Sequence, residues 1–130
     1  MPVNSAESVR TVPRVMLGGA LLLWLAGCYA LRFGLMESRA AADFCLLDET
    51  AWPCLLRAEL GRWIYLQYFG IAALLLVLAA NLARGGARFF LAAAALFVAV
   101  AALVLYNVNL GAPAAVFSLL TLAAPRSTRP

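Results

Sequence analysis

The residues best suited to chemistry gather in one polar stretch of the chain, residues 37–62. This stretch holds five of the six acidic residues and two of the three cysteines, Cys45 and Cys54. Eight residues separate the two cysteines. Redox-active pairs usually have two residues between them, so that one thiolate is activated by the setting of the other. Outside the cytoplasm a cysteine pair is readily oxidised. We therefore predict a structural disulfide between Cys45 and Cys54.

The carboxylates of this stretch are candidates for acid–base catalysis or cation binding. They are Asp43, Asp48, Glu49 and Glu59, and they are interleaved with Arg39, Arg57 and Arg62. We interpret this mixture as the charges of a solvated loop. The chain has no histidine, and it contains no phosphate loop, serine-hydrolase elbow or dinucleotide fingerprint. The sequence therefore predicts no catalytic residue, no enzyme activity, no metal and no cofactor.

The composition is that of an integral membrane protein. Hydrophobic residues make up 65% of the 130 residues and charged residues only 12%, against roughly 45–50% and about 25% in soluble domains. A soluble chain of this size could not bury so much apolar surface. The net charge of +4 comes from scattered arginines without a single lysine, so no clustered face for nucleic acid is present. An Ala-rich chain without lysine is typical of a GC-rich bacterial source, which predicts the bacterial inner membrane.

Four apolar segments predict the fold, an all-α membrane protein built as a small bundle of four transmembrane helices. The predicted spans are 15–35, 63–83, 89–106 and 109–124, within a single transmembrane domain over 15–125. The first three are long enough for a hydrocarbon core of roughly 30 Å. The last is short, and a start near Val108 would lengthen it to include Pro113. A re-entrant or interfacial segment is the alternative there.

The arginines predict the orientation of these helices. With the N-terminus inside, the cytoplasmic segments carry Arg10, Arg14, Arg84, Arg88, Arg126 and Arg129. The positive-inside rule favours this arrangement. It makes 1–14 a flexible cytoplasmic tail, 126–130 a second cytoplasmic tail and 36–62 an extracytoplasmic loop. Within the loop, Ser38 is expected to cap a helix over 39–47. Asp48 or Thr50 is expected to cap a second helix that runs towards residue 60.

The first span carries three features of its own. Ala26, Ala30 and Gly34 repeat every four residues and form a face of small side chains for helix packing. Arg32, near the end of the span, is expected to extend its guanidinium to the lipid headgroups. Cys28 is interpreted as a packing residue. The segment 25–28, Leu-Ala-Gly-Cys, also resembles a bacterial lipobox, so processing at Cys28 is left open, as is cleavage of the span as a signal peptide.

These features favour a non-catalytic accessory or structural subunit. Its helices would pack in the lipid bilayer with a larger membrane protein or with further copies of the chain, and Trp52, Leu55 and Leu56 would contact the partner outside. A membrane thiol-disulfide oxidoreductase that uses Cys45 and Cys54 is one alternative. The chain resembles the quinone-linked disulfide-forming families in helix number and external cysteines, but it lacks their C-x-x-C. A small oligomeric transporter of lipids or small molecules is the other.

Overall fold

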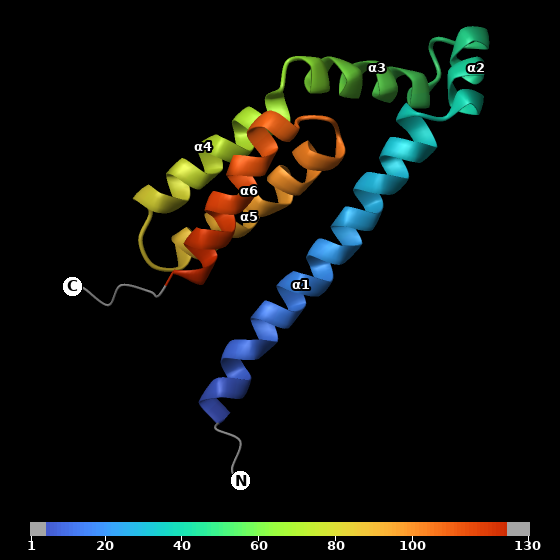
Figure 1. Cartoon of the computed structure of the whole chain (residues 1–130). Helices are drawn as coiled ribbons and strands as arrows, with labels where there is room; N and C mark the ends of the chain where they lie inside the picture. Colours follow the sequence, from blue (N-terminus) through green and yellow to red (C-terminus); the bar gives the residue numbers. More distant parts are fainter. Residues whose placement is uncertain (1–4, 125–130) are drawn as a thin grey trace.

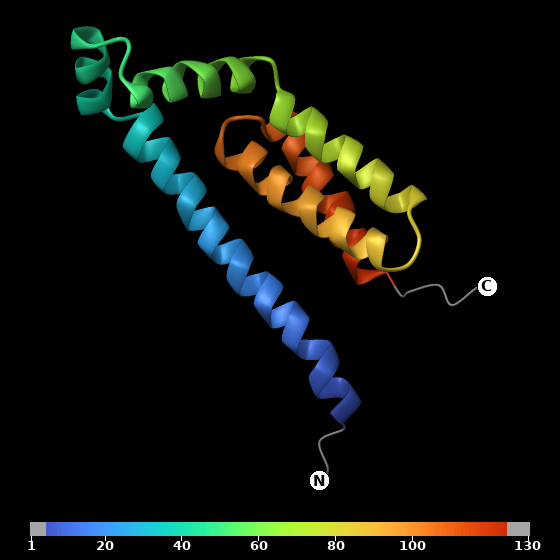
Figure 2. The same ribbon diagram turned by 180° about the vertical axis from the view of Figure 1, so that it is seen from behind.

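The computed structural model describes residues 5–124, with side chains from residue 13 onward, and this part of the chain is entirely helical (Figures 1 and 2). Its elements are α1 (Ser5–Leu31), the π-helical turn η1 (Arg32–Met36), α2 (Arg39–Leu47), α3 (Trp52–Tyr65), α4 (Tyr68–Leu82), α5 (Gly86–Val104) and α6 (Val108–Ala123). The described residues contain no sheet, which confirms the all-α class. The predicted tail 126–130 and the first four residues lie outside the described residues.

Two helical segments are long and apolar enough to cross a membrane, Pro13–Met36 and Gly86–Val104. A third crossing is counted if α3 and α4, which meet at an angle of 60°, form one bent span. Helix α6 is apolar but has only 16 residues, or about 24 Å at 1.5 Å per residue, which is less than a bilayer core of roughly 30 Å. The structure thus supports two to three candidate spans and one shorter apolar helix.

Helix α1 begins ten residues earlier than the predicted first span, because residues 5–14, expected as a flexible tail, are helical. Helix formation is cooperative, so each residue added to an existing helix gains one hydrogen bond at little cost. The Glu and Arg residues of this segment are good helix formers, and they extend the helix into the polar sequence. Pro13 lies inside the helix.

The predicted second span, 63–83, is interrupted by a bend at Leu66–Gln67. The backbone N–H groups of Leu66 and Gln67 donate to the carbonyls of Arg62 and Ile64, which ends α3, and Gln67 has the left-handed backbone angle φ 56°. Helix α3 therefore lies across one end of the molecule, from the end of α1 to the start of α4 (Figure 1). Of the predicted second span, only the part that forms α4, with 15 residues, runs alongside α5 and α6.

Helices α4, α5 and α6 form the packed body of the protein around very small side chains. Ala73, Ala99 and Ala114, one from each helix, are each 0% exposed and contact one another. Without larger side chains between them, the helix backbones approach closely, which is how membrane helices gain van der Waals contact. At Gly70 a Cβ atom would lie 2.5 Å from the Cβ of Leu110. At Gly111 it would lie 3.0 Å from the Cβ of Ala102.

Helix α1 contacts this body along one face of its C-terminal half. The indole N–H of Trp24 donates to the carbonyl of Phe97 at 2.8 Å, and Cys28 is buried against Ala101 and Val104 of α5. Cys28 is the one free cysteine among the described residues, in the packing position that we predicted for it. Towards its N-terminus α1 diverges from the body (Figures 1 and 2).

Candidate functional site

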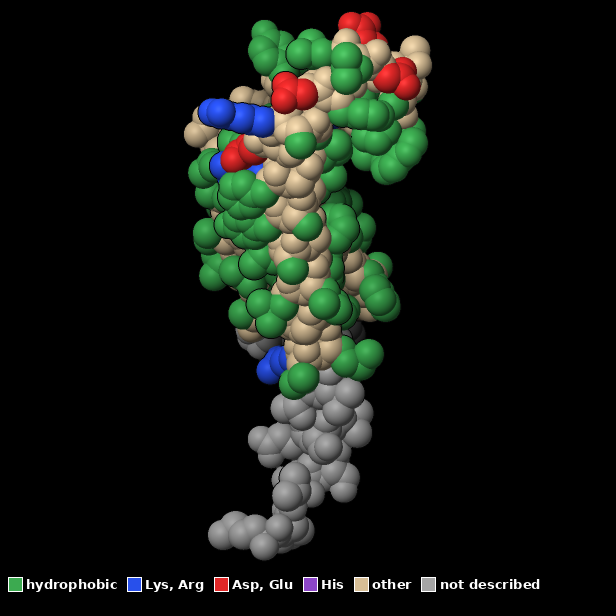
Figure 3. Space-filling view, turned by 90° about the vertical axis from the view of Figure 1, so that its right-hand side faces the viewer, with side chains coloured by type: hydrophobic (Ala, Val, Ile, Leu, Met, Phe, Trp, Pro, Cys, Tyr) green, Lys and Arg blue, Asp and Glu red, His purple; other side chains and the backbone are tan. Residues whose placement is uncertain are grey.

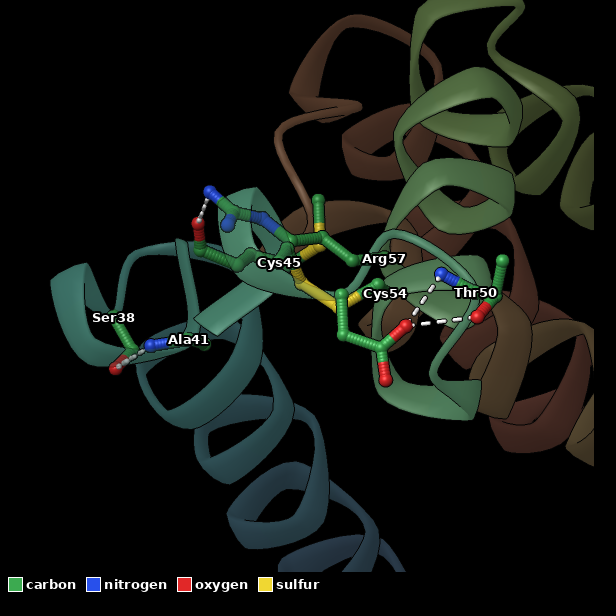
Figure 4. Close-up of a disulfide and its surroundings, with 8 residues drawn as sticks. Ser38, Ala41, Cys45, Thr50, Cys54 and Arg57 are labelled. Carbon is green, nitrogen blue, oxygen red and sulfur yellow. Dashed lines mark hydrogen bonds between the residues drawn. A yellow bond between two sulfur atoms is a disulfide. The ribbon is translucent and has the colours of Figure 1, made fainter. Parts of the chain in front are cut away.

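The polar stretch forms a compact unit of two helices, α2 and α3, closed by the predicted disulfide. We call residues 38–65 the α2–α3 unit. Cys45, in the last turns of α2, is bonded to Cys54, in the first turn of α3, and their Cα atoms are 5.5 Å apart (Figure 4). Cys54 is buried, with 7% of its surface exposed. The bridge therefore joins the end of one helix to the start of the next and sets the corner between them.

Local hydrogen bonds explain where the two helices begin. The Oγ atom of Ser38 accepts a bond from the backbone N–H of Ala41, so the predicted cap of α2 is confirmed (Figure 4). The predicted caps of α3 are wrong. An Oδ atom of Asp48 accepts bonds from both the N–H and the hydroxyl of Thr50, because an aspartate readily closes a turn onto the residue two positions on. The N-cap of α3 is Ala51, without a side-chain bond.

One further bond ties the α2–α3 unit to the first span. The guanidinium of Arg57, in the middle of α3, donates to the carbonyl of Met36 at the end of η1, with 3.3 Å between the nitrogen and the oxygen (Figure 4). This carbonyl belongs to the last turn of a helical segment, where carbonyls lack intrahelical partners. The unit is thus attached to the first span through Arg57, and at its other end it continues into α4.

A charged cluster joins η1 to the turn between α5 and α6. The Nε atom of Arg32 lies 2.8 Å from a carboxylate oxygen of Glu37, and its Nη1 atom donates to the carbonyl of Val104 at 3.0 Å. Tyr106 donates its hydroxyl proton to the same carboxylate, and its ring centroid lies 4.1 Å from the Arg32 guanidinium carbon. The guanidinium of Arg32 therefore pairs within the protein, which offsets the cost of a charge near hydrocarbon, and its extension to the headgroups stays a prediction.

The geometry of η1 explains why this cluster forms. In a π-helical turn the hydrogen bond runs from residue i+5 to residue i, and the N–H of Glu37 donates to the carbonyl of Arg32 at 2.8 Å. This wider turn brings the side chains of Arg32 and Glu37 together at a spacing of five residues. Tyr106 is held with a φ of 71°, a conformation that a bulky residue rarely adopts. The nearness of Arg32 and Glu37 in the sequence was the one available signal for this cluster, and neither this pair nor Tyr106 was predicted.

The surface of the α2–α3 unit is unusually apolar for a polar stretch. The predicted contact residues Trp52, Leu55 and Leu56 are 75%, 56% and 40% exposed. The structure adds three residues that the sequence reasoning missed, at the end of α2: Phe44 (49%), Leu46 (81%) and Leu47 (88%). Figure 3 shows acidic side chains gathered at the same end of the molecule. The unit therefore presents exposed apolar groups beside carboxylates.

The small-residue face of the first span points away from the rest of the chain. Ala26 and Ala30 are exposed, and at Gly34 an added Cβ would meet nothing within 4 Å. Trp24 and Cys28, which contact α5, lie on the opposite side of α1. The face is consequently open within this chain, and its role in packing against another protein stays a prediction.

The disulfide supplies a direct test of how the α2–α3 unit is stabilised. Replacing Cys45 and Cys54 together with serine is expected to lower the free energy of unfolding by about 2.5 kcal/mol, because the unfolded chain regains the entropy of a short closed loop. Denaturant unfolding of the purified protein measures this loss. Reductant should lower the unmodified protein to the same level and leave the variant unchanged. Rapid exchange of the disulfide with small thiols under native conditions would instead identify a redox-active pair.

The chemistry open to this region is limited by its side chains. Among the residues whose side chains are described, no group of three or more His, Cys, Asp or Glu residues is placed to hold a metal ion. The Glu37 carboxylate pairs with Arg32, the Asp48 carboxylate bonds Thr50 in a turn, and the two thiols of the α2–α3 unit are joined. The α2–α3 unit presents an exposed apolar surface that the disulfide holds in place. Compared with known proteins, the chain matches no family model, and no curated protein and no solved structure matches it.

Proposed function

We propose that this protein is a non-catalytic accessory subunit of a larger membrane-protein assembly in a bacterial inner membrane. It would cross the membrane four times, with both termini in the cytoplasm and the α2–α3 unit outside. The arrangement of the helices supports this topology. The start of α1, the α4–α5 turn and the end of α6 lie towards one end of the molecule, and the α2–α3 unit lies at the other (Figure 1). Arg84 lies in the α4–α5 turn, and Arg14 and Arg88 lie near the same end.

The observation that carries the proposal is the set of exposed apolar side chains on the α2–α3 unit. Leu46, Leu47 and Trp52 are 81%, 88% and 75% exposed, on a segment that follows the end of the candidate span at Met36. Large apolar groups beyond the hydrocarbon core have no lipid tails to cover them, and exposed apolar patches of this kind mark interaction sites. The disulfide and the Arg57–Met36 bond hold these groups in place before binding, which lowers the entropy cost of association.

The first span supports the same proposal from inside the membrane. Only 6% of the most apolar part of Pro13–Met36 is buried, compared with 44% in Gly86–Val104. Helix α1 therefore has most of its surface free for a neighbour. Its outer face carries the Ala26, Ala30 and Gly34 repeat, where a partner helix can approach to backbone distance.

Site-specific photo-crosslinking in native membranes tests the proposal. A photoreactive amino acid at Leu47, Trp52 or Ala30 should give one and the same crosslinked product with a protein larger than this chain. Matched positions on the outer face of α4, Leu75 and Leu78, which are 61% and 57% exposed, should give none. Trp52→Glu should abolish the product from Leu47. Products that contain only copies of this chain, or no product at all from the three test positions, would refute the accessory-subunit function.

A further inference from the structure

A groove with a volume of about 430 Å³ separates the N-terminal half of α1 from α5 and α6. Its walls include Leu17 and Leu21 of α1, Phe89 and Leu96 of α5, and Leu119 of α6, with Arg14 at one end. The volume falls within the range of roughly 300–1,000 Å³ of ligand sites in proteins. The groove is thus large enough for a ligand, and most of its lining is apolar.

The groove continues the face by which α1 contacts α5. Arg14, Leu17, Leu21 and Cys28 recur every three to seven residues and lie on one side of the helix. Cys28 fills its part of this face by packing on α5, whereas beside Gly18 an added Cβ would meet nothing within 4 Å. From Leu21 towards its N-terminus, α1 therefore stands apart from α5 and α6 and leaves an apolar gap at the depth of the bilayer. Within a bilayer such a gap is filled by hydrocarbon, because polar groups cannot be satisfied there.

The charged side chains that the structure describes near the groove are all basic. Arg14 lines the groove, Arg88 directly precedes the groove residue Phe89, and Arg84 lies in the adjoining turn. Residues 13–31 and 83–124 contain no acidic residue. All acidic side chains that the structure describes belong to residues 37–59, at or near the opposite end. Basic residues near a membrane surface attract anionic lipids, and an arginine binds phosphate through a forked pair of hydrogen bonds.

We propose that this groove binds one anionic phospholipid. Its acyl chain lies along Leu17, Leu21 and Phe89, and its phosphate is bound by Arg14 with Arg88 close by. The lipid fills the space between α1 and the body and so holds α1 in position. This site is on the inner side of α1, whereas the partner surface proposed above is on its outer side and on the α2–α3 unit. The lipid site does not rest on the accessory-subunit function.

Native mass spectrometry of the purified full-length protein tests the site, with phosphatidylglycerol and phosphatidylcholine as the two probes. We expect one bound phosphatidylglycerol per chain, held about fivefold more tightly than phosphatidylcholine for each arginine engaged. Gly18→Phe places a ring in the groove and should weaken binding of both lipids roughly tenfold, since overfilling a packed space is costly. Gly19→Phe is the matched control, because its side chain points to another face of α1 and should leave binding unchanged.

The headgroup contact is tested separately with a variant that leaves the apolar walls intact. Arg14→Gln should lower the affinity for phosphatidylglycerol about fivefold and leave that for phosphatidylcholine unchanged. Arg39→Gln removes the same charge at the opposite end, in α2, and should change neither affinity. Equal effects of Gly18→Phe and Gly19→Phe would overturn the groove. Equal affinities for the two lipids would overturn the headgroup contact. A stable dimer without bound lipid would show that a second copy fills the space.

Discussion

Replacing Gly111 with leucine is expected to lower the free energy of unfolding by about 3 kcal/mol, towards the upper end of the cost of overpacking a core. A Cβ atom at Gly111 would lie 3.0 Å from the Cβ of Ala102, 3.1 Å from the backbone nitrogen of Leu103 and 3.3 Å from the carbonyl oxygen of Ala99. Two of these atoms belong to the backbone of α5 and cannot turn aside. The helices must therefore separate, and the contacts around Ala99 and Ala114 are lost with them.

The measurement is denaturant unfolding of the purified protein in detergent, followed by circular dichroism. Gly27→Leu is the matched control, because an added Cβ there would meet nothing within 4 Å and leucine favours a helix more than glycine does. It should leave the stability unchanged or raise it slightly. Gly70→Leu should resemble Gly111→Leu, since its Cβ would lie 2.5 Å from that of Leu110. Equal stability of the Gly27 and Gly111 variants would show that α5 and α6 do not pack at backbone distance.

Replacing Arg32 with methionine is expected to lower the free energy of unfolding by about 3 kcal/mol. The ion pair contributes at most about 1 kcal/mol of this, because the side chains of Arg32 and Glu37 are 26% and 37% exposed. The remainder comes from the charged hydrogen bond to Val104 and the cation–π contact with Tyr106. The substitution leaves the Glu37 carboxylate without its cation and the Val104 carbonyl without its charged donor. It also removes the cation from the face of Tyr106, a residue held in an unfavourable backbone conformation.

Arg39→Met is the control, because it removes the same charge from an exposed position at the start of α2. It should cost less than about 0.5 kcal/mol, as surface substitutions usually do. A double-mutant cycle of Arg32→Met with Glu37→Gln should give a coupling energy of at least about 0.5 kcal/mol, as expected for residues in contact. Additive effects of the two substitutions would mean that Arg32 and Glu37 do not act as a unit.

The features that were predicted correctly from the sequence depend on residues close together in the chain. The Cys45–Cys54 disulfide spans nine positions, and the Ser38 cap of α2 spans three. The helical class and the apolar segments follow from composition and length, because a backbone in lipid must satisfy its hydrogen bonds within each helix. The prediction that Asp48 or Thr50 caps α3 was wrong, and the reason is also local. Asp48 has two ways to bond the nearby backbone, and composition does not decide between a turn and a helix cap.

The features that were missed depend on residues far apart in the chain. Arg32 and Tyr106 lie 74 positions apart, so nothing near Arg32 indicates that an aromatic ring and a carbonyl will receive it. The bend at Gln67 interrupts a run of sequence that is apolar on both sides, and its aromatic residues suited the start of a single span. The bend follows from two attachments. The disulfide and Arg57 hold α3 at the end of the first span, while Gly70 brings α4 against α6.

The helical class, the suitability for a membrane and the disulfide of the polar stretch could all be predicted from the sequence. Hydrophobic length, helix capping and short-range cysteine pairing are local properties, and each is strong enough to outweigh its alternatives. The tertiary structure was needed to show which face of α1 packs on α5, which groups Arg32 contacts and where the groove beside Leu17 and Phe89 lies. Many Ala and Gly faces of this chain are nearly equivalent in composition. The choice among them depends on how several helices fit together at once.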